Sequence, residues 1–142
     1  MVDRAALTTA EIEAGNALAI DFAKLRKVAS WGHDLVPVVV QDADSGAVLI
    51  LAYADAEALE QTLRTRLATF WSTSRGQLWV KGATSGDLLD LVEVRVNCEQ
   101  NSLLYRVRRR GAGACHTRDS AGRPRTSCYY RRIAADGTLE FA

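Results

Sequence analysis

Three cysteines and one of the only two histidines lie in the C-terminal part of this chain. Cys98, Cys115 and Cys128 are separated by 16 and 12 residues, and His116 directly follows the second cysteine. An odd number of thiols favours metal ligation or a reactive thiol over a disulfide framework. No C-x-x-C pair is present, which excludes the zinc-finger and zinc-ribbon classes. Zinc is nevertheless the first metal that these thiols predict.

Three protein ligands are typical of a catalytic zinc, because the fourth position stays open to a water that the metal activates. His116 is then the candidate general acid or base. The spacing alone leaves a second interpretation open, in which Cys98 is a buried strand residue and the other two cysteines are incidental. The remaining histidine, His33, stands in a Ser-Trp-Gly-His-Asp cluster and is expected to be a surface loop residue rather than a ligand.

The bulk composition predicts one domain of a cytoplasmic protein. The chain has 142 residues, of which 48% are hydrophobic, enough for one core. It has no apolar run of the ~18 residues that a membrane span needs, and no signal peptide is recognisable. We therefore expect no membrane partner.

Charge is distributed unevenly along the chain. Residues 1–60 carry four basic and ten acidic side chains, whereas residues 106–132 hold nine arginines and one aspartate. A cationic surface of this kind could meet nucleic acid or hold the phosphates of a small ligand, or its arginines could simply be solvated residues of strands and loops. The sequence pI of 7.7 is below that of typical nucleic-acid-binding domains, so the sequence predicts a phosphorylated small molecule and no nucleic acid.

The elements that must position these groups form an α+β pattern. A capping box at Thr8 and Glu11 predicts a helix from about Thr9 to Val28, and Asp55 is the expected N-cap of a helix through Arg66. Alternating and β-branched runs predict strands at 35–41, 48–53, 69–74, 77–81, 88–97, 102–109 and 128–133. In the 88–97 strand, Val92, Val94 and Val96 are expected to share one face. The first few residues and the tail after Ala134 are expected to be disordered.

A loop of small residues is a candidate anion cradle. Lys81 precedes Gly-Ala-Thr-Ser-Gly at 82–86, so backbone amides and the hydroxyls of Thr84 and Ser85 lie beside a cation. Most loops of this composition are turns, so this signal is weak alone.

Several blocks together strongly resemble the phosphoribosyl-AMP cyclohydrolase family of histidine biosynthesis. They are FWSTSR at 70–75, WVKGATSG at 79–86, NCEQN at 97–101, ACHT at 114–117 and SCYYR at 127–131. The resemblance runs from about Leu35 to Arg132. It implies an α+β fold, mainly antiparallel strands with a few helices, in an intertwined homodimer.

The resemblance also implies chemistry. Zinc would be held near the subunit interface by the equivalents of Cys98, Cys115 and Cys128, contributed by both chains. The family's reaction opens the adenine ring of phosphoribosyl-AMP between N1 and C6, by attack of zinc-activated water on C6.

Three departures from the family pattern stand out. Where the family has three aspartates that bind magnesium on one face of a strand, this chain has Asn97, Glu99 and Asn101. Because Mg²⁺ is held largely by carboxylates, we expect its binding to be weakened or lost. Thr73 replaces an arginine, and the Cys115–Cys128 segment is longer than usual.

These observations predict a domain organisation and a set of site residues. The chain divides into an N-terminal helical extension at 1–34, a cyclohydrolase-like domain at 35–133 and a C-terminal tail at 134–142. Besides the zinc cysteines and His116, we expect substrate contacts from the following side chains: Arg75, Lys81, Thr84, Ser85 and Trp79. Trp71 and Trp79 could each stack on a base or belong to the core.

Three functions compete. The first is phosphoribosyl-AMP cyclohydrolase activity. The second is a diverged zinc hydrolase that acts on another purine-like or nitrogen-heterocyclic substrate without magnesium. The third is a non-catalytic, zinc-stabilised dimeric binding module.

Overall fold

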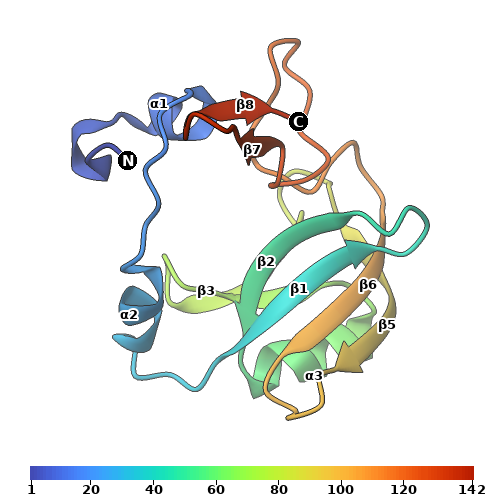
Figure 1. Cartoon of the computed structure of the whole chain (residues 1–142). Coiled ribbons are helices and arrows are strands. Elements are labelled where there is room, and N and C mark those ends of the chain that lie inside the picture. The colour runs from blue at the N-terminus through green and yellow to red at the C-terminus, as the bar shows by residue number, and fades with distance from the viewer. The chain divides into compact units, whose positions relative to one another are not determined.

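The computed structural model describes all 142 residues, which form two compact units. The larger unit is Trp31–Cys128, and the smaller unit combines Met1–Ser30 with Tyr129–Ala142. Each unit is described separately (Figure 1). No helix in the chain is both long enough and apolar enough to span a membrane.

The larger unit is built on a curled, mixed sheet of six strands (Figure 1). The strands are β1 (Val36–Asp42), β2 (Val48–Ala54), β3 (Thr69–Ser72), β4 (Gln77–Val80), β5 (Leu89–Val96) and β6 (Leu103–Arg109). Their order is β4-β3-β2-β1-β6-β5, and β1 and β6 are the parallel pair among antiparallel neighbours. The predicted α+β class and the six predicted strands of this unit are confirmed.

One helix, α3 (Ala56–Thr65), packs against β3 and β2. Its N-terminus is capped as predicted, because the Asp55 carboxylate accepts from the backbone N–H of Ala58 at 2.7 Å. Thr62 is fully buried, and its hydroxyl exchanges hydrogen bonds with the backbone of Thr69. These hydrogen bonds satisfy the buried hydroxyl and link the helix to β3. The core beneath the helix includes Phe70, Tyr105 and other fully buried side chains.

The predicted alternation in β5 is interrupted. The pairing of β5 with β6 shifts register between Leu91 and Glu93, so Val92 is the extra residue of a bulge. Leu89 and Leu91 are buried before the bulge, and Val94 packs against the core after it. The prediction that Val92 shares a face with Val94 and Val96 was therefore wrong.

The single long helix predicted for Thr9–Val28 was also wrong. The smaller unit instead has a 3₁₀ turn at Arg4–Ala6, α1 (Thr9–Ala14) and α2 (Lys24–Ala29). The predicted capping box is present, since Thr8 and Glu11 exchange side-chain and backbone hydrogen bonds. However, α1 ends at Gly15, and no residue of α1 is buried to hold further turns together.

The segment after Ala134 is ordered, which corrects the expectation of a disordered tail. β7 (Arg131–Ile133) pairs with β8 (Leu139–Phe141) in an antiparallel hairpin. Cys128–Tyr130, which were expected to open this last strand, lie outside it. The Arg131 guanidinium donates at 2.7 Å to the carbonyls of Ile12 and Gly15, so it satisfies orphan acceptors at the end of α1.

Candidate active site

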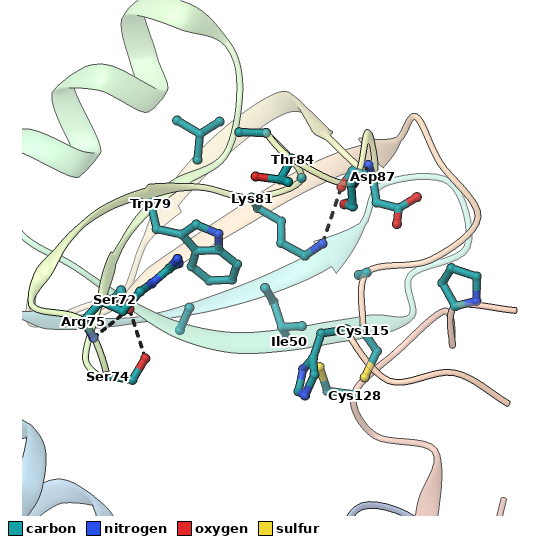
Figure 2. Close-up of a pocket in the computed structure, with 18 of the residues that line it drawn as sticks. Ile50, Ser72, Ser74, Arg75, Trp79, Lys81, Thr84, Asp87, Cys115 and Cys128 are labelled. Atoms are coloured by element: carbon teal, nitrogen blue, oxygen red, sulfur yellow. Dashed lines mark hydrogen bonds between the residues drawn. The ribbon is translucent and has the colours of Figure 1, made fainter. Parts of the chain in front are cut away.

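A cavity of about 810 Å³ opens on the larger unit. Its walls come from β2, the β3–β4 hairpin, the loop 81–87 and the segment 114–128 (Figure 2). The volume lies in the range that holds a small-molecule ligand. Most of the residues that the sequence singled out line it: Arg75, Trp79, Lys81, Thr84, Ser85, Cys115, His116 and Cys128.

Cys115 and Cys128 lie side by side at one edge of this cavity (Figure 2). Cys115 is buried, and its sulfur contacts the Thr117 hydroxyl at 3.0 Å. Cys128 is held to β2, because its backbone N–H donates to the carbonyl of Leu49 at 2.8 Å. Burial and the neighbouring Cys115 sulfur raise the pKa of Cys128 to about 12. Two adjacent thiolates thus disfavour each other unless a cation lies between them.

Cys98 is not part of this pair. It lies exposed in the turn between β5 and β6, ahead of the N-terminal end of β6, whereas Cys115 follows the C-terminal end. A strand of this length spans roughly 20 Å. Within one chain, no group of three or more histidine, cysteine, aspartate or glutamate side chains is placed to hold a metal ion.

The β5–β6 turn also holds Asn97, Glu99 and Asn101. The family aspartates were expected on one strand face, but these side chains share a turn and bond to one another. Asn97 Nδ2 donates to Asn101 Oδ1 at 2.7 Å, and Asn101 Nδ2 donates to Glu99 Oε2 at 3.0 Å. Asn97 Oδ1 accepts from the backbone N–H groups of Asn101 and Ser102. Asn97 Oδ1, Asn101 Oδ1 and Glu99 Oε2 therefore already accept hydrogen bonds within the turn.

Lys81 is the buried cation of the cavity, with a relative exposure of 7%. Burial lowers the pKa of Lys81, although Asp87 and the two cysteines oppose that change. Its Nζ donates to the Asp87 carbonyl at a long 3.5 Å (Figure 2). A buried ammonium with so weak an acceptor favours an anionic or oxygen-rich ligand beside it.

The predicted cradle after Lys81 folds back on itself. Gly82 has φ +82°, and a Cβ there would lie 2.3 Å from the Asp87 carbonyl oxygen, so only glycine fits. The Gly86 N–H donates to the Gly82 carbonyl at 2.8 Å. This turn brings Thr84 and Ser85 to the cavity wall.

The two tryptophans have different surroundings. Trp79 lines the cavity while its ring also contacts Phe70, with centroids 5.6 Å apart, so it serves both the site and the core. Trp71 is absent from the cavity wall and stacks on His33. The sequence analysis did not single out five further polar residues of the wall: Ser72, Ser74, Gln77, Asp87 and Arg118. Ser72 and Ser74 carried a signal, because they lie in the FWSTSR block, and Arg118 lies in the lengthened segment between two cysteines.

The arginine-rich region is less cationic than the sequence suggested. Acidic partners neutralise many of its side chains, in the pairs Arg106–Glu93, Arg108–Asp44, Arg109–Asp42, Arg110–Asp90 and Arg123–Asp119. Apart from Asp119, these partners lie outside residues 106–132, so the net charge of that segment concealed them.

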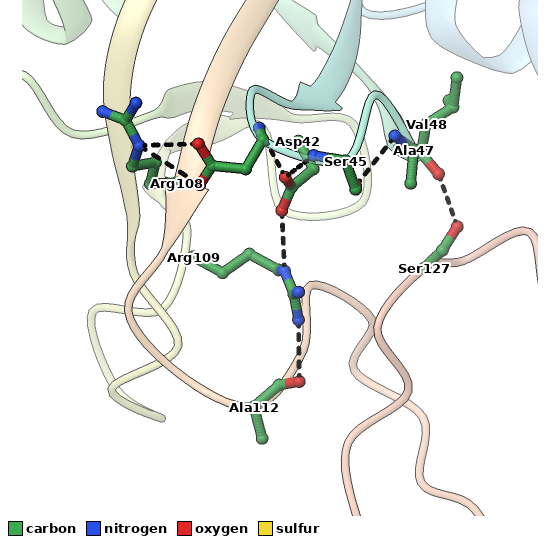
Figure 3. A network of polar contacts seen from close by, with 9 residues as sticks. Asp42, Ser45, Ala47, Val48, Arg108, Arg109, Ala112 and Ser127 are labelled. Atoms are coloured by element: carbon green, nitrogen blue, oxygen red, sulfur yellow. Dashed lines mark hydrogen bonds and ion pairs between the residues drawn. The ribbon is translucent and has the colours of Figure 1, made fainter.

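One of these pairs, Asp42 with Arg109, joins the ends of β1 and β6 (Figure 3). The buried Asp42 carboxylate accepts from the backbone N–H groups of Ser45 and Asp44, and from Arg109 Nε at 3.2 Å. Arg109 also donates to the carbonyl of Ala112, just before the segment that carries Cys115. Hydrogen bonding by the Ser45 N–H, with help from Arg109, holds the pKa of Asp42 below its ordinary value despite burial.

The donor sets differ in the metals they fit. The adjacent sulfurs of Cys115 and Cys128 fit a soft or borderline cation such as zinc, which prefers thiolates. The β5–β6 turn fits magnesium poorly, because it offers one carboxylate and most of its side-chain oxygens already accept hydrogen bonds.

Comparison with known proteins gives one consistent result. The sequence profile described as "Phosphoribosyl-AMP cyclohydrolase" matches residues 50–130. The protein of that name from Hyphomonas neptunium is 50% identical over 109 residues, which cover 77% of each chain. That from Thermobifida fusca is 55% identical over 85 residues, covering 60% of this chain and 72% of the relative. The histidine biosynthesis bifunctional protein HisIE of Deinococcus radiodurans is 52% identical over 114 residues, 75% of this chain and 49% of that longer protein.

Proposed function

The chain belongs to the phosphoribosyl-AMP cyclohydrolase family, and from this membership we infer that it hydrolyses phosphoribosyl-AMP in histidine biosynthesis. The reaction adds water across the N1–C6 bond of the adenine ring and opens it. The observation that carries this proposal is the cavity in which a cysteine pair, His116 and the buried Lys81 meet. That combination supplies metal ligands, a proton carrier and an anion contact within one site.

We propose that zinc is held by Cys115 and Cys128 together with Cys98 of a second copy of the chain. The adjacent sulfurs of the first two support this assignment, as does the position of Cys98 at the other end of β6. A homodimer in which each cavity is completed by the partner's Cys98 satisfies both observations. When bound, zinc supplies Lewis-acid activation of water at neutral pH.

The other residues have separate roles. His116 takes a proton from the attacking water or gives one to the leaving N1 nitrogen. Lys81 and Arg75 contact phosphate or ribose oxygens, with hydroxyls from Thr84 and Ser85. Trp79 offers an aromatic face to the base. Arg118 adds a further cation at the wall.

We propose that no magnesium acts through the β5–β6 turn of this chain. The mutual hydrogen bonds of Asn97, Glu99 and Asn101 hold the turn in shape without a cation. We further propose a cytoplasmic enzyme whose ligand is a phosphorylated purine nucleotide rather than nucleic acid or a membrane.

The test is turnover of phosphoribosyl-AMP by metal-analysed protein. We expect ring opening with about one zinc per chain, the stoichiometry of one three-cysteine site per subunit. Protein with that zinc content and no turnover would instead favour a zinc hydrolase with another nitrogen-heterocyclic substrate. A folded protein that binds neither zinc nor phosphoribosyl-AMP would contradict both assignments.

A further inference from the structure

The segment directly before β1 lies against the β3–β4 turn, about forty residues later in the chain. Trp31 Nε1 donates to the carbonyl of Thr73 at 2.6 Å. The indole ring covers Gly76, where a Cβ would lie 2.4 Å from a ring carbon. Gly76 also has φ +64°, a backbone conformation that favours glycine. The indole and the turn are thus fitted to each other.

A second residue of this segment attaches to the same hairpin. The His33 ring stacks on Trp71 of β3, with centroids 4.0 Å apart and planes inclined by 15°. Its Nε2 lies 2.8 Å from Asp55 Oδ2, and the other oxygen of that carboxylate caps α3. His33 therefore joins β3 to the start of the helix. We call residues 31–33 the strap.

The hairpin needs such support. β4 is the edge strand of the sheet, and β3 pairs with β2 through one residue pair, Tyr53 with Trp71. Few sheet hydrogen bonds therefore fix the position of the β3–β4 turn, and segments with few such bonds open readily. The strap supplies contacts that the sheet does not.

The supported turn is also part of the cavity wall. Ser72, Ser74 and Arg75 line the cavity. The Ser72 hydroxyl accepts from the backbone N–H of Arg75 at 3.2 Å and contacts the Ser74 hydroxyl at 3.2 Å (Figure 2). The Gly76 N–H donates to the Ser72 carbonyl at 2.8 Å, which closes the turn that Trp31 covers. Trp31 thus acts on the same few residues that present the Arg75 guanidinium.

We propose that Trp31 and His33 are positioning residues that hold the β3–β4 turn, and with it Arg75, in place for a phosphate group of the substrate. Neither residue lines the cavity, and both lie before the residues that the family profile matches. The inference rests on the proposed function for the identity of the substrate. The class of ligand, a phosphate monoester, does not depend on the proposed function.

The test compares W31A, W31F and G76A with wild type. W31A should raise KM for phosphoribosyl-AMP about tenfold with kcat changed less than about twofold, because the strap orders a binding group and leaves the reacting atoms untouched. G76A forces the indole away and strains the turn at its positive φ, so it should also raise KM. In W31A/G76A the two effects on KM should combine to less than their product, because both act through the same contact. W31F keeps a ring over Gly76 and loses the N–H, so its KM should lie between those of W31A and wild type.

A matched control is F22A, which removes an exposed aromatic residue of the smaller unit. It should leave KM and kcat unchanged. Inorganic phosphate binding to the zinc-loaded protein is measured in parallel, and W31A and R75A should both weaken it. If wild type fails to turn over phosphoribosyl-AMP, the proposed function is wrong, and the phosphate measurement alone then decides the strap. Unchanged KM and phosphate affinity in folded W31A and W31F, or a loss confined to kcat, would overturn the inference.

Discussion

The backbone N–H of Cys128 donates to the carbonyl oxygen of Leu49 at 2.8 Å, which ties this thiol to β2. The adjacent Ser127 hydroxyl donates to the carbonyl of Val48 at 2.8 Å (Figure 3). Cys128 is thus fixed beside Cys115 by the sheet, whereas Cys98 sits on a turn at the other end of β6. One chain therefore presents two separate halves of the proposed zinc site.

This separation predicts complementation between inactive subunits. C98A and C115A should each lose zinc and turnover as homodimers. After unfolding and refolding together in equal amounts, they should regain about one quarter of wild-type activity, because half of the dimers are mixed and each holds one complete site. Zinc content after gel filtration is the second measurement. C115A mixed with C128A is the matched control, because both lesions lie in the same half, and it should regain nothing. Full zinc occupancy in C115A alone would refute the ligand assignment.

His116 is predicted to act in proton transfer and not in metal binding. H116A should keep its zinc and lose about 10²- to 10⁴-fold in kcat, the usual cost of removing a general acid or base. KM should change little. The comparison is H116Q, which retains polarity without the acid–base function and should be equally slow. Loss of zinc from both variants would instead identify His116 as a ligand.

The β5–β6 turn is predicted to work without magnesium. Turnover by the zinc-loaded enzyme should change less than about twofold when Mg²⁺ is titrated from zero, because the turn offers one carboxylate and most of its side-chain oxygens already accept hydrogen bonds. The variant N97D/N101D restores carboxylates and removes both amide donors. Like charges on neighbouring carboxylates should then make its stability, measured by thermal unfolding, respond to Mg²⁺. A wild-type enzyme that needs Mg²⁺ would show that a cation competes successfully with these hydrogen bonds.

Local patterns predicted much of the fold and less of the site. Alternating runs and turn residues gave the six strands of the larger unit, and Asp55 gave the start of α3, because these features depend on near neighbours. The prediction of a helix that continues through Gly15 was wrong, because the apolar periodicity extends into a region where no tertiary contact buries the helix. The bulge at Val92 and the ordered tail depend on strand pairing, which a single segment does not reveal.

In the site, too, local motifs were predictable from the sequence, whereas contacts between side chains were not. Lys81 and the small-residue loop were visible as a motif, and they do line the cavity. The hydrogen bonds among Asn97, Glu99 and Asn101 depend on side-chain geometry in a turn that is closed by Gln100 at φ +55°. The contact of Trp31 with Thr73 joins residues 42 positions apart, and no periodicity encodes such a pairing.

Asp42 is predicted to make the stability of the fold depend on pH. The folded pKa of its carboxyl lies below the ordinary 3.8, through the Ser45 N–H first and then Arg109, against the effect of burial. Its stabilisation is therefore complete above pH 3.8 and is lost as the pH falls through the lower, folded-state pKa. D42N should lower the free energy of unfolding by about 2 kcal/mol at pH 7, because it removes the carboxylate partner of the partly buried Arg109. Below pH 3.8, the difference between wild type and D42N in the free energy of unfolding, measured in urea, should shrink.

D44N is the matched control. The Asp44 side chain is 67% exposed and pairs with the 60% exposed Arg108, so the loss of its charge should cost less than about 1 kcal/mol. Equal effects of D42N and D44N, or a difference that grows in acid, would contradict the assigned role of Asp42.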